Sequence, residues 1–245
     1  MFTRMKVAVL GAAVSSLFPS ANALEIAPTM ITLERDRPIA TLKLANDGAT
    51  EKTYELTGFS WRQRDGNDQL SKAPTLIITP PVTSLAPGEE TLVRVGLASA
   101  STHSDGEETY RIRVRDITPA SPNAANALRI RMEFLLPVIV PANAPQTNLR
   151  LADARERDGA LCIRLRNEGN AYQKIIGIGG HNGPAEMVPV QQYILPASEA
   201  TICSEALMGV PHALITAELA PTYASNAQML YLAAGNASVP HQTDD

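Results

Sequence analysis

Hydrophobic and polar residues alternate along most of the chain, and a period of two residues is typical of β-strands with one buried and one exposed face. The alternation is clear in residues 39–47, 53–61 and 107–119, which are separated by turns rich in glycine, proline and asparagine. Asp65-Gly66 is the strongest turn signal, because a two-residue hairpin turn needs positive φ angles. Helical periodicity is absent from this region of the sequence. The pattern therefore predicts an antiparallel β-sandwich.

A proline-rich stretch, PANAPQ at residues 141–146, interrupts the strand pattern and is typical of a linker. The same texture of short strands and turns resumes beyond it. We therefore expect an all-β protein with one β-domain at residues 24–142 and a second, smaller one at residues 143–245.

The stretch LRIRMEFLLPVIVPA, residues 128–142, combines two patterns. Its first half alternates apolar with charged residues, and its second half is almost wholly apolar around Pro137. Proline cannot donate a hydrogen bond to a ladder, so the strand is expected to lie at a sheet edge or to be bulged at this residue. A long apolar edge strand is a site of aggregation unless something covers it.

The N-terminus has the features of a secretory signal peptide. Arg4 and Lys6 precede an apolar run that is too short to span a bilayer, and Ala21-Asn22-Ala23 has the pattern of a cleavage site. The alternative is a buried N-terminal helix. We expect residues 1–23 to be removed, no membrane insertion, and a mature protein in a bacterial periplasm.

The net charge and the number of cysteines limit the possible partners and covalent links of the protein. The formal net charge is −4 and the sequence has no basic tract, so nucleic acid is not an expected partner. In an oxidising compartment the only two cysteines, Cys162 and Cys203, are expected to form a disulfide. The alternative is a pair of free buried thiols.

We find no motif for catalysis, for a metal or for a cofactor. None of the four histidines lies within three or four residues of another histidine or of a cysteine. The glycine-rich GIGGHNG at residues 177–183 has Asn182 where a dinucleotide fingerprint requires glycine, so we interpret it as a flexible turn. The sequence therefore predicts no catalytic residues, no metal site, no cofactor and no enzymatic activity.

Four segments in their order and spacing resemble the periplasmic pilus chaperones of the chaperone–usher pathway, and in particular the archaic branch. The resemblance covers the chain from Leu24 onwards and is strongest in the first half. The segments are LEIAPTMITLERDRPIATLKLANDG, GFSWRQRDGNDQL, TPPVTSLAPGEETLVRVGL and YRIRVRDITP.

This resemblance implies two immunoglobulin-like β-sandwiches in an L-shaped arrangement. It also implies that the last strand of the first domain is donated to an open groove of a pilus or fimbrial subunit, which explains an apolar edge strand. The donor residues would be Leu128, Ile130, Met132 and Phe134, about 7 Å apart at a rise of roughly 3.3 Å per residue. The alternative is that these four side chains fill the core of the protein itself.

The match fails at the expected anchors for the subunit's C-terminal carboxylate. The position of an arginine on the first strand is occupied by Met30, and LLPVIV contains no lysine. We therefore suggest Arg113 as the anchor, with Arg111 as second choice, because a carboxylate that leaves water needs a charged partner. Arg115 is expected nearer the junction of the domains. The alternative is that these arginines are solvated or internally paired.

The resemblance implies a chaperone that binds subunits after export and delivers them to an outer-membrane usher. The other candidates are a secreted structural surface protein or adhesin subunit built from β-sandwiches, and a secreted enzyme. A subunit would usually have one domain and a disordered donor segment, whereas this strand pattern begins at Leu24.

Overall fold

A computed structural model of the chain describes residues 24–98, 106–120, 130–180, 187–210, 215–220, 228–233 and 236–238, the last two by their backbone alone. The expected signal peptide, residues 1–23, and the donor residue Leu128 lie outside these ranges. In the part of the chain that is described, no helix has the length and apolar character needed to cross a membrane.

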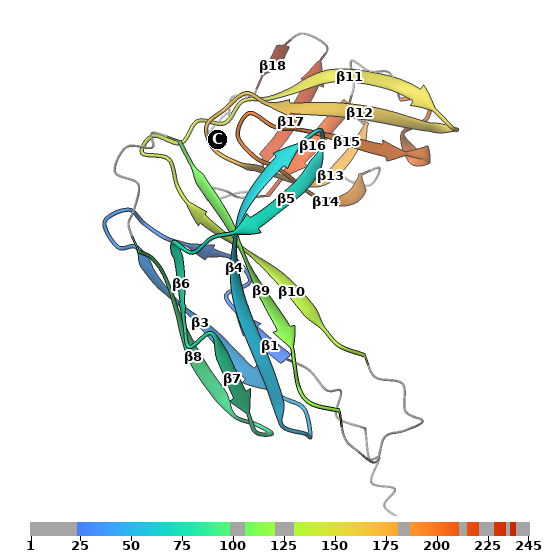
Figure 1. Ribbon diagram of the computed structural model, residues 1–245. Helices are drawn as coiled ribbons and strands as arrows, with labels where there is room; N and C mark the ends of the chain where they lie inside the picture. Colours follow the sequence, from blue (N-terminus) through green and yellow to red (C-terminus); the bar gives the residue numbers. More distant parts are fainter. Residues whose placement is uncertain are drawn as a thin grey trace, which may run out of the picture.

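The first domain is a sandwich of two sheets (Figure 1). One sheet has the order β1-β3-β8-β6, and the other has the order β2-β10-β9-β4-β5 with β7 also paired to β4. The strands are β1 (Leu24–Ala27), β2 (Ile31–Thr32), β3 (Ile39–Asn46), β4 (Lys52–Arg64), β5 (Asn67–Lys72), β6 (Leu76–Thr79), β7 (Val82–Leu85), β8 (Glu90–Leu97), β9 (Glu108–Asp116) and β10 (Glu133–Val140).

The second domain is again a sandwich, with one sheet of order β11-β12-β15 and one of order β14-β13-β16-β17-β18. Each domain has a separate apolar core built from the inward-facing side chains of its own two sheets. The elements are β11 (Leu149–Arg157), β12 (Ala160–Asn167), β13 (Gln173–Gly180), β14 (Val188–Ile194), β15 (Glu199–Ser204), the short 3-10 helix η2 (Glu205–Leu207), β16 (Ile215–Leu219), β17 (Gln228–Ala233) and β18 (Asn236–Ser238).

The expected hairpin at Asp65-Gly66 joins β4 to β5. Both turn residues have positive φ angles, 51° and 76°, and Arg64 pairs with Asn67 across the turn. Figure 1 shows this hairpin leaving the first sandwich and reaching the second domain beside β13 and β14. The turn predicted from Asp65-Gly66 thus belongs to a hairpin that contacts both domains.

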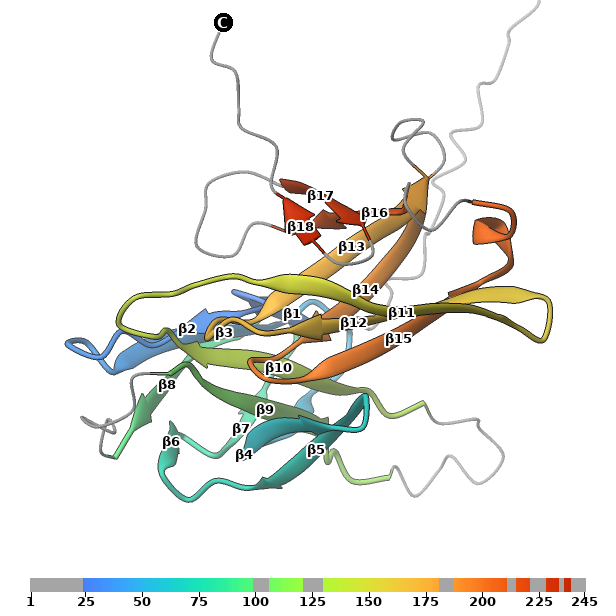
Figure 2. The same ribbon diagram turned by 90° about the horizontal axis from the view of Figure 1, so that it is seen from above.

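The strand β10 lies between β9 and the short strand β2. Its antiparallel pairing with β9 runs from Glu133 to Val140 without a register shift, whereas β2 pairs only with Val138 and Ile139. In the described part of the chain, no strand therefore lies on the β2 side of residues 133–137. Figure 2, seen from above, shows β10 beside β9 at the margin of this sheet.

Backbone hydrogen bonds explain why Pro137 is tolerated in β10. The N–H of Leu33, just after β2, donates to the carbonyl of Ile139 at 2.8 Å, and the N–H of Asp116 on β9 donates to the carbonyl of Met132 at 3.2 Å. Because the N–H and C=O of one residue point to the same side of a strand, odd-numbered residues of β10 face away from β9. The missing N–H of Pro137 falls on that side, so the pairing with β9 loses no hydrogen bond.

The interpretation of GIGGHNG as a turn was wrong for its first half. Gly177 to Gly180 form the end of β13 and pair with Ile215 to Glu218 of β16, while residues 181–183 lie outside the described ranges. A side chain at Gly177 would come within 3.0 Å of the Glu218 carboxylate and 3.1 Å of the Met187 side chain. Gly177 therefore permits close packing in a strand.

Cys162 and Cys203 form a disulfide, as expected. They are directly opposite each other in the antiparallel pair β12–β15. The alternative of two free thiols is thereby excluded. The domain boundary at residues 142 and 143 falls in the connection between β10 and β11 and stays a prediction.

Candidate functional site

The alternating apolar positions of residues 130–140 divide into a buried and an exposed part. Leu136, Val138 and Val140 are buried in the core of the first domain. Phe134 is half-buried against the same core. The two residues that precede it on the same alternation, Ile130 and Met132, are 72% and 52% exposed.

These exposed fractions distinguish the two interpretations of the alternating apolar residues, as a donor strand or as part of the protein's own core. The view that they fill the protein's own core holds for the C-terminal part of β10, but Ile130 and Met132 contribute nothing to that core. The regular strand also begins later than the sequence pattern indicates, at Glu133. Of the predicted donor side chains, Ile130 and Met132 are thus exposed at the N-terminal approach to β10.

Leu135 is an exposed apolar residue that the sequence reasoning missed. It lies on the opposite face of β10 from Phe134, and 44% of it is exposed. The pattern that could have revealed it is the doublet LLP, in which an apolar residue occupies a position that alternation assigns to the polar face. Leu135 therefore extends the exposed apolar surface around the open edge of the strand.

Arg111, Arg113 and Arg115 share one face of β9 but have different surroundings. Arg115 is exposed and forms an ion pair with Glu55 at 2.7 Å. Arg111 is nearly buried, with 12% of its side chain exposed. Arg113 is half-buried opposite Leu135, and its guanidinium carbon is 4.9 Å from the centre of the Phe59 ring.

Arg113 differs from its two neighbours in having no acidic partner among the described residues. Its Nε is buried and has no hydrogen-bond partner there. A buried donor without a partner costs free energy, and an incoming acceptor would remove this cost. Arg113 is therefore the arginine of this row that is best placed to accept a new carboxylate.

Arg111, on β9, contacts residues of four other strands at the junction of the domains. Its guanidinium carbon is 3.6 Å from the centre of the Trp61 ring and 5.3 Å from that of Tyr193 on β14. Its Nη2 is 3.7 Å from the Asp68 carboxylate on β5, and its Nη1 donates to the carbonyl of Leu135 at 3.2 Å. Burial in this setting lowers the pKa of Arg111, while Asp68 opposes that effect.

The expected position of Arg115 was wrong. It pairs with Glu133, far along β9 from the junction, and Arg111 is the arginine that meets the second domain. The direction of β9 explains the error, because the strand enters from the junction at Glu108 and leaves it towards Asp116. Alternation in a sequence assigns faces, but it does not tell which end of a strand meets another domain.

An aromatic cluster fills the junction. Trp61, Tyr172 and Tyr193 pack together, with ring centroids 5.4 Å apart for Trp61 and Tyr193 and 5.8 Å apart for Tyr172 and Tyr193. Burial raises the pKa of Tyr172 to about 12. The Tyr172 hydroxyl donates to the sulfur of Met30 at 3.4 Å, so the position expected to lack its arginine lies in this apolar cluster.

Gln63 ties the hairpin to the second domain through its side-chain amide. Nε2 donates to the carbonyl of Tyr193, and Oε1 accepts from the N–H of Leu195, both at 2.9 Å. A polar cavity of about 250 Å³ lies beside this contact and is lined by Gln63, Asp68, Arg111 and Gln192 among others. The described residues hold no group of three or more histidine, cysteine or acidic side chains suited to a metal.

Comparison with known proteins agrees with this architecture. Residues 23–145, half of the chain, match the family of pili and flagellar-assembly chaperones through its PapD N-terminal domain. The chain is 25% identical over 193 residues to the chaperone protein PapD of Escherichia coli, covering 73% of this chain and 78% of that protein.

Two similar solved structures are complexes of chaperones. One is the CsuC–CsuE chaperone–tip subunit pre-assembly complex from archaic chaperone–usher pili of Acinetobacter baumannii. It has a TM-score of 0.67 and 17% identity, and the match covers 84% of this chain and 97% of that one. The other is the Salmonella enterica SafB chaperone in complex with the SafA pilin, with a TM-score of 0.62, 15% identity, and coverage of 86% and 97%.

These similarities confirm the expected fold class of two immunoglobulin-like sandwiches in an L-shaped arrangement. The relatives are chaperones and not enzymes. The family match extends over the first sandwich, including β10 and the arginine row of β9. The chain therefore belongs to the family of pili assembly chaperones defined by the PapD N-terminal domain.

Proposed function

We propose that this protein is a periplasmic chaperone of the archaic chaperone–usher type, which binds pilus or fimbrial subunits and delivers them to an outer-membrane usher. The likeness to the CsuC–CsuE structure supports the archaic type. So does the lack of both expected basic anchors, since position 30 is a methionine and residues 135–140 contain no lysine or arginine. The family assignment argues against the alternative of a structural surface subunit.

The observation that carries the proposal is the exposed end of the β10 stripe. Ile130 and Met132 extend the row of core side chains beyond the sandwich, at 72% and 52% exposure. Next to them, the backbone groups of Glu133 and Leu135 face the side on which the described residues place no strand. A subunit strand added there would gain main-chain hydrogen bonds and would bury apolar side chains at the same time.

The energetics suit a donated strand. Fully burying a side chain such as Ile or Met contributes about 1.5–3 kcal/mol. Leu128 and Phe134 would complete the set of donor residues, with Phe134 already partly used by the protein's own core. We assign the subunit's C-terminal carboxylate to Arg113, because Arg111 already contacts Asp68, Trp61 and Tyr193.

Replacement of the exposed donor side chains tests this function. The protein is expressed in the periplasm with each small secreted protein encoded nearby, and complexes are isolated by size exclusion. The variant Ile130→Glu, Met132→Glu should lose a one-to-one complex that the unchanged protein forms, because two carboxylates would have to enter an apolar groove.

Leu92→Glu is the matched control. Leu92 is 62% exposed on β8, in the other sheet, so its replacement adds one carboxylate, where the double variant adds two, at an exposed apolar position away from β10. The control should keep the complex. A complex that survives in the double variant, or that is lost equally in the control, would show that binding does not use the end of β10.

A further inference from the structure

The disulfide of the second domain lies on the solvent side of its sheet. Leu161, Ile163 and Leu165 alternate into the core, so Cys162 between them points outward. On β15, Ala200 and Ile202 face the core, and Cys203 is exposed. Cys162 is 9% exposed, so the two cysteine residues differ in their access to solvent.

The bond joins strands that are already held together. Six residue pairs, from Leu161–Ser204 to Arg166–Glu199, connect β12 to β15, and β15 is the last strand of its sheet in the described part of the chain. Opening the disulfide would therefore leave the ladder intact. Exposed disulfides of this kind belong to the exchangeable class, whereas buried ones resist reduction.

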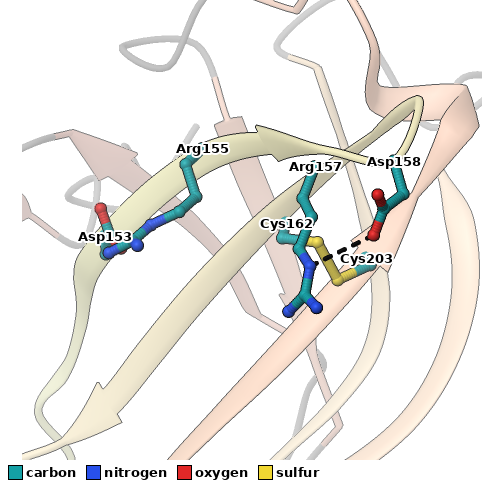
Figure 3. Close-up of a disulfide and its surroundings, with 6 residues drawn as sticks. All are labelled: Asp153, Arg155, Arg157, Asp158, Cys162 and Cys203. Carbon is teal, nitrogen blue, oxygen red and sulfur yellow. Dashed lines mark hydrogen bonds and ion pairs between the residues drawn. A yellow bond between two sulfur atoms is a disulfide. The ribbon is translucent and has the colours of Figure 1, made fainter.

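One arginine of β11 lies beside the disulfide. Arg155 on β11 is directly opposite Cys162, and Arg157 is its diagonal neighbour on the same face. Figure 3 shows the Arg155 side chain turned along β11 towards Asp153, away from the disulfide, whereas the Arg157 side chain projects towards the two sulfur atoms. Arg155 donates to Asp153 at 2.6 Å and Arg157 to Asp158 at 3.2 Å, so each keeps part of its donor capacity.

We propose that Cys162–Cys203 is a site of thiol–disulfide exchange with small thiols. The thiolate of the incoming molecule attacks Sγ of Cys203, a new S–S bond forms there, and the Cys162–Cys203 bond breaks. Cys162 leaves with the electron pair as a thiolate, near Arg157. A second thiol then attacks the mixed disulfide and releases Cys203 as a thiolate, so that one disulfide is reduced and two thiols are oxidised.

Arg157 is a positioning residue in this reaction. A guanidinium beside the disulfide lowers the pKa of the departing thiol, and a leaving group of lower pKa departs faster. Both groups lie near the surface, where solvent screens the charge, so we expect an effect on the exchange rate of about two- to fivefold.

The test measures reduction of the folded full chain by dithiothreitol, with acid quenching and mass spectrometry. The rate should be independent of urea below the unfolding transition, because attack occurs on the folded protein. With glutathione as the probe, the adduct should map to Cys203. Reduction that requires unfolding, or an adduct predominantly on Cys162, would overturn the proposal.

Arg157→Gln should slow the reduction two- to fivefold, and Arg166→Gln is its matched control. Arg166 is exposed on the same face of β12, four residues from Cys162. In a Cys203→Ser background, thiolate absorbance should show a higher pKa for Cys162 when Arg157 is replaced and no change when Arg166 is replaced. Equal behaviour of the two arginine variants would exclude the role of Arg157. Because this readout requires no subunit, its failure is independent of the proposed chaperone function.

Discussion

At the scale of single residues, neighbouring arginines on one strand have different surroundings. Arg115 is paired with Glu55 and exposed, Arg111 is packed between aromatic rings, and Arg113 has a buried Nε without a partner among the described residues. The same residue type at a spacing of two thus has three environments, which are set by what lies across the sheet at each position.

We predict that Arg113→Glu weakens binding of a subunit by about 10- to 100-fold. Hydrogen bonds to charged groups contribute about 1.5–3 kcal/mol, and the reversed charge would repel a carboxylate. The measurement is the affinity of a purified subunit for the chaperone variants, obtained by competition between labelled and unlabelled chaperone.

Arg115→Glu is the control, because Arg115 is on the same face of the same strand and should change the affinity less than threefold. A subunit extended by several residues at its C-terminus gives a second comparison. If Arg113 holds the terminal carboxylate, the extension should weaken binding to the unchanged protein and have little effect on the Arg113→Glu variant. An unchanged affinity for Arg113→Glu would remove Arg113 as the anchor.

At the scale of elements, β10 combines two roles along one strand. Its C-terminal part supplies Leu136, Val138 and Val140 to the core, and its N-terminal approach leaves Ile130 and Met132 exposed. The core residues hold the strand firmly against β9, so the exposed end is presented from a rigid support. Pro137 lies within the C-terminal part and removes a hydrogen-bond donor only on the side that faces away from β9.

Much of this element could be predicted from the sequence. The period of two identified the shared face, and Pro137 predicted an edge position, because both depend only on the geometry of one strand. The division between core and exposed positions could not be predicted, since it depends on where the facing sheet ends. Leu135 was missed for the same reason, and Gly177 to Gly180 were misread because close packing against β16 is a tertiary property.

At the scale of the whole molecule, side chains of the first domain hold the second domain. Among them, the amide of Gln63 makes the hydrogen bonds to the backbone of the second domain that a neighbouring strand would otherwise make. The Gln63 amide donates to the carbonyl of Tyr193 and accepts from the N–H of Leu195, and Arg111 lies between Trp61 and Tyr193. The Asp65-Gly66 hairpin could be recognised in the sequence, but its partner could not, because these contacts form only when both domains are folded and docked.

We predict that Gln63→Glu loosens the junction of the domains. The carboxylate would place a second acceptor against the carbonyl of Tyr193 and near Asp68, at a cost of about 1–3 kcal/mol. Trp61 is the only tryptophan of the chain and is 1% exposed, so its fluorescence reports on this contact directly. The emission should shift to longer wavelength, and quenching by acrylamide should increase.

The matched control is Gln69→Glu, an exposed residue of the same hairpin, which should leave the emission of Trp61 unchanged. Identical spectra for the Gln63→Glu variant and the unchanged protein would mean that the aromatic cluster alone holds the domains together.

The central claim is that a partner strand adds to the open edge of β10, and hydrogen exchange of single backbone amides tests it most directly. The N–H groups of Glu133 and Leu135 face the open side, whereas those of Phe134 and Leu136 already face β9. In the free protein the odd-numbered amides should exchange quickly and the even-numbered ones slowly. In the complex with a subunit, the amides of Glu133 and Leu135 should become protected by at least 100-fold, with little change at Phe134 and Leu136. If both odd-numbered amides still exchange quickly in a stable complex, strand donation by β10 is contradicted.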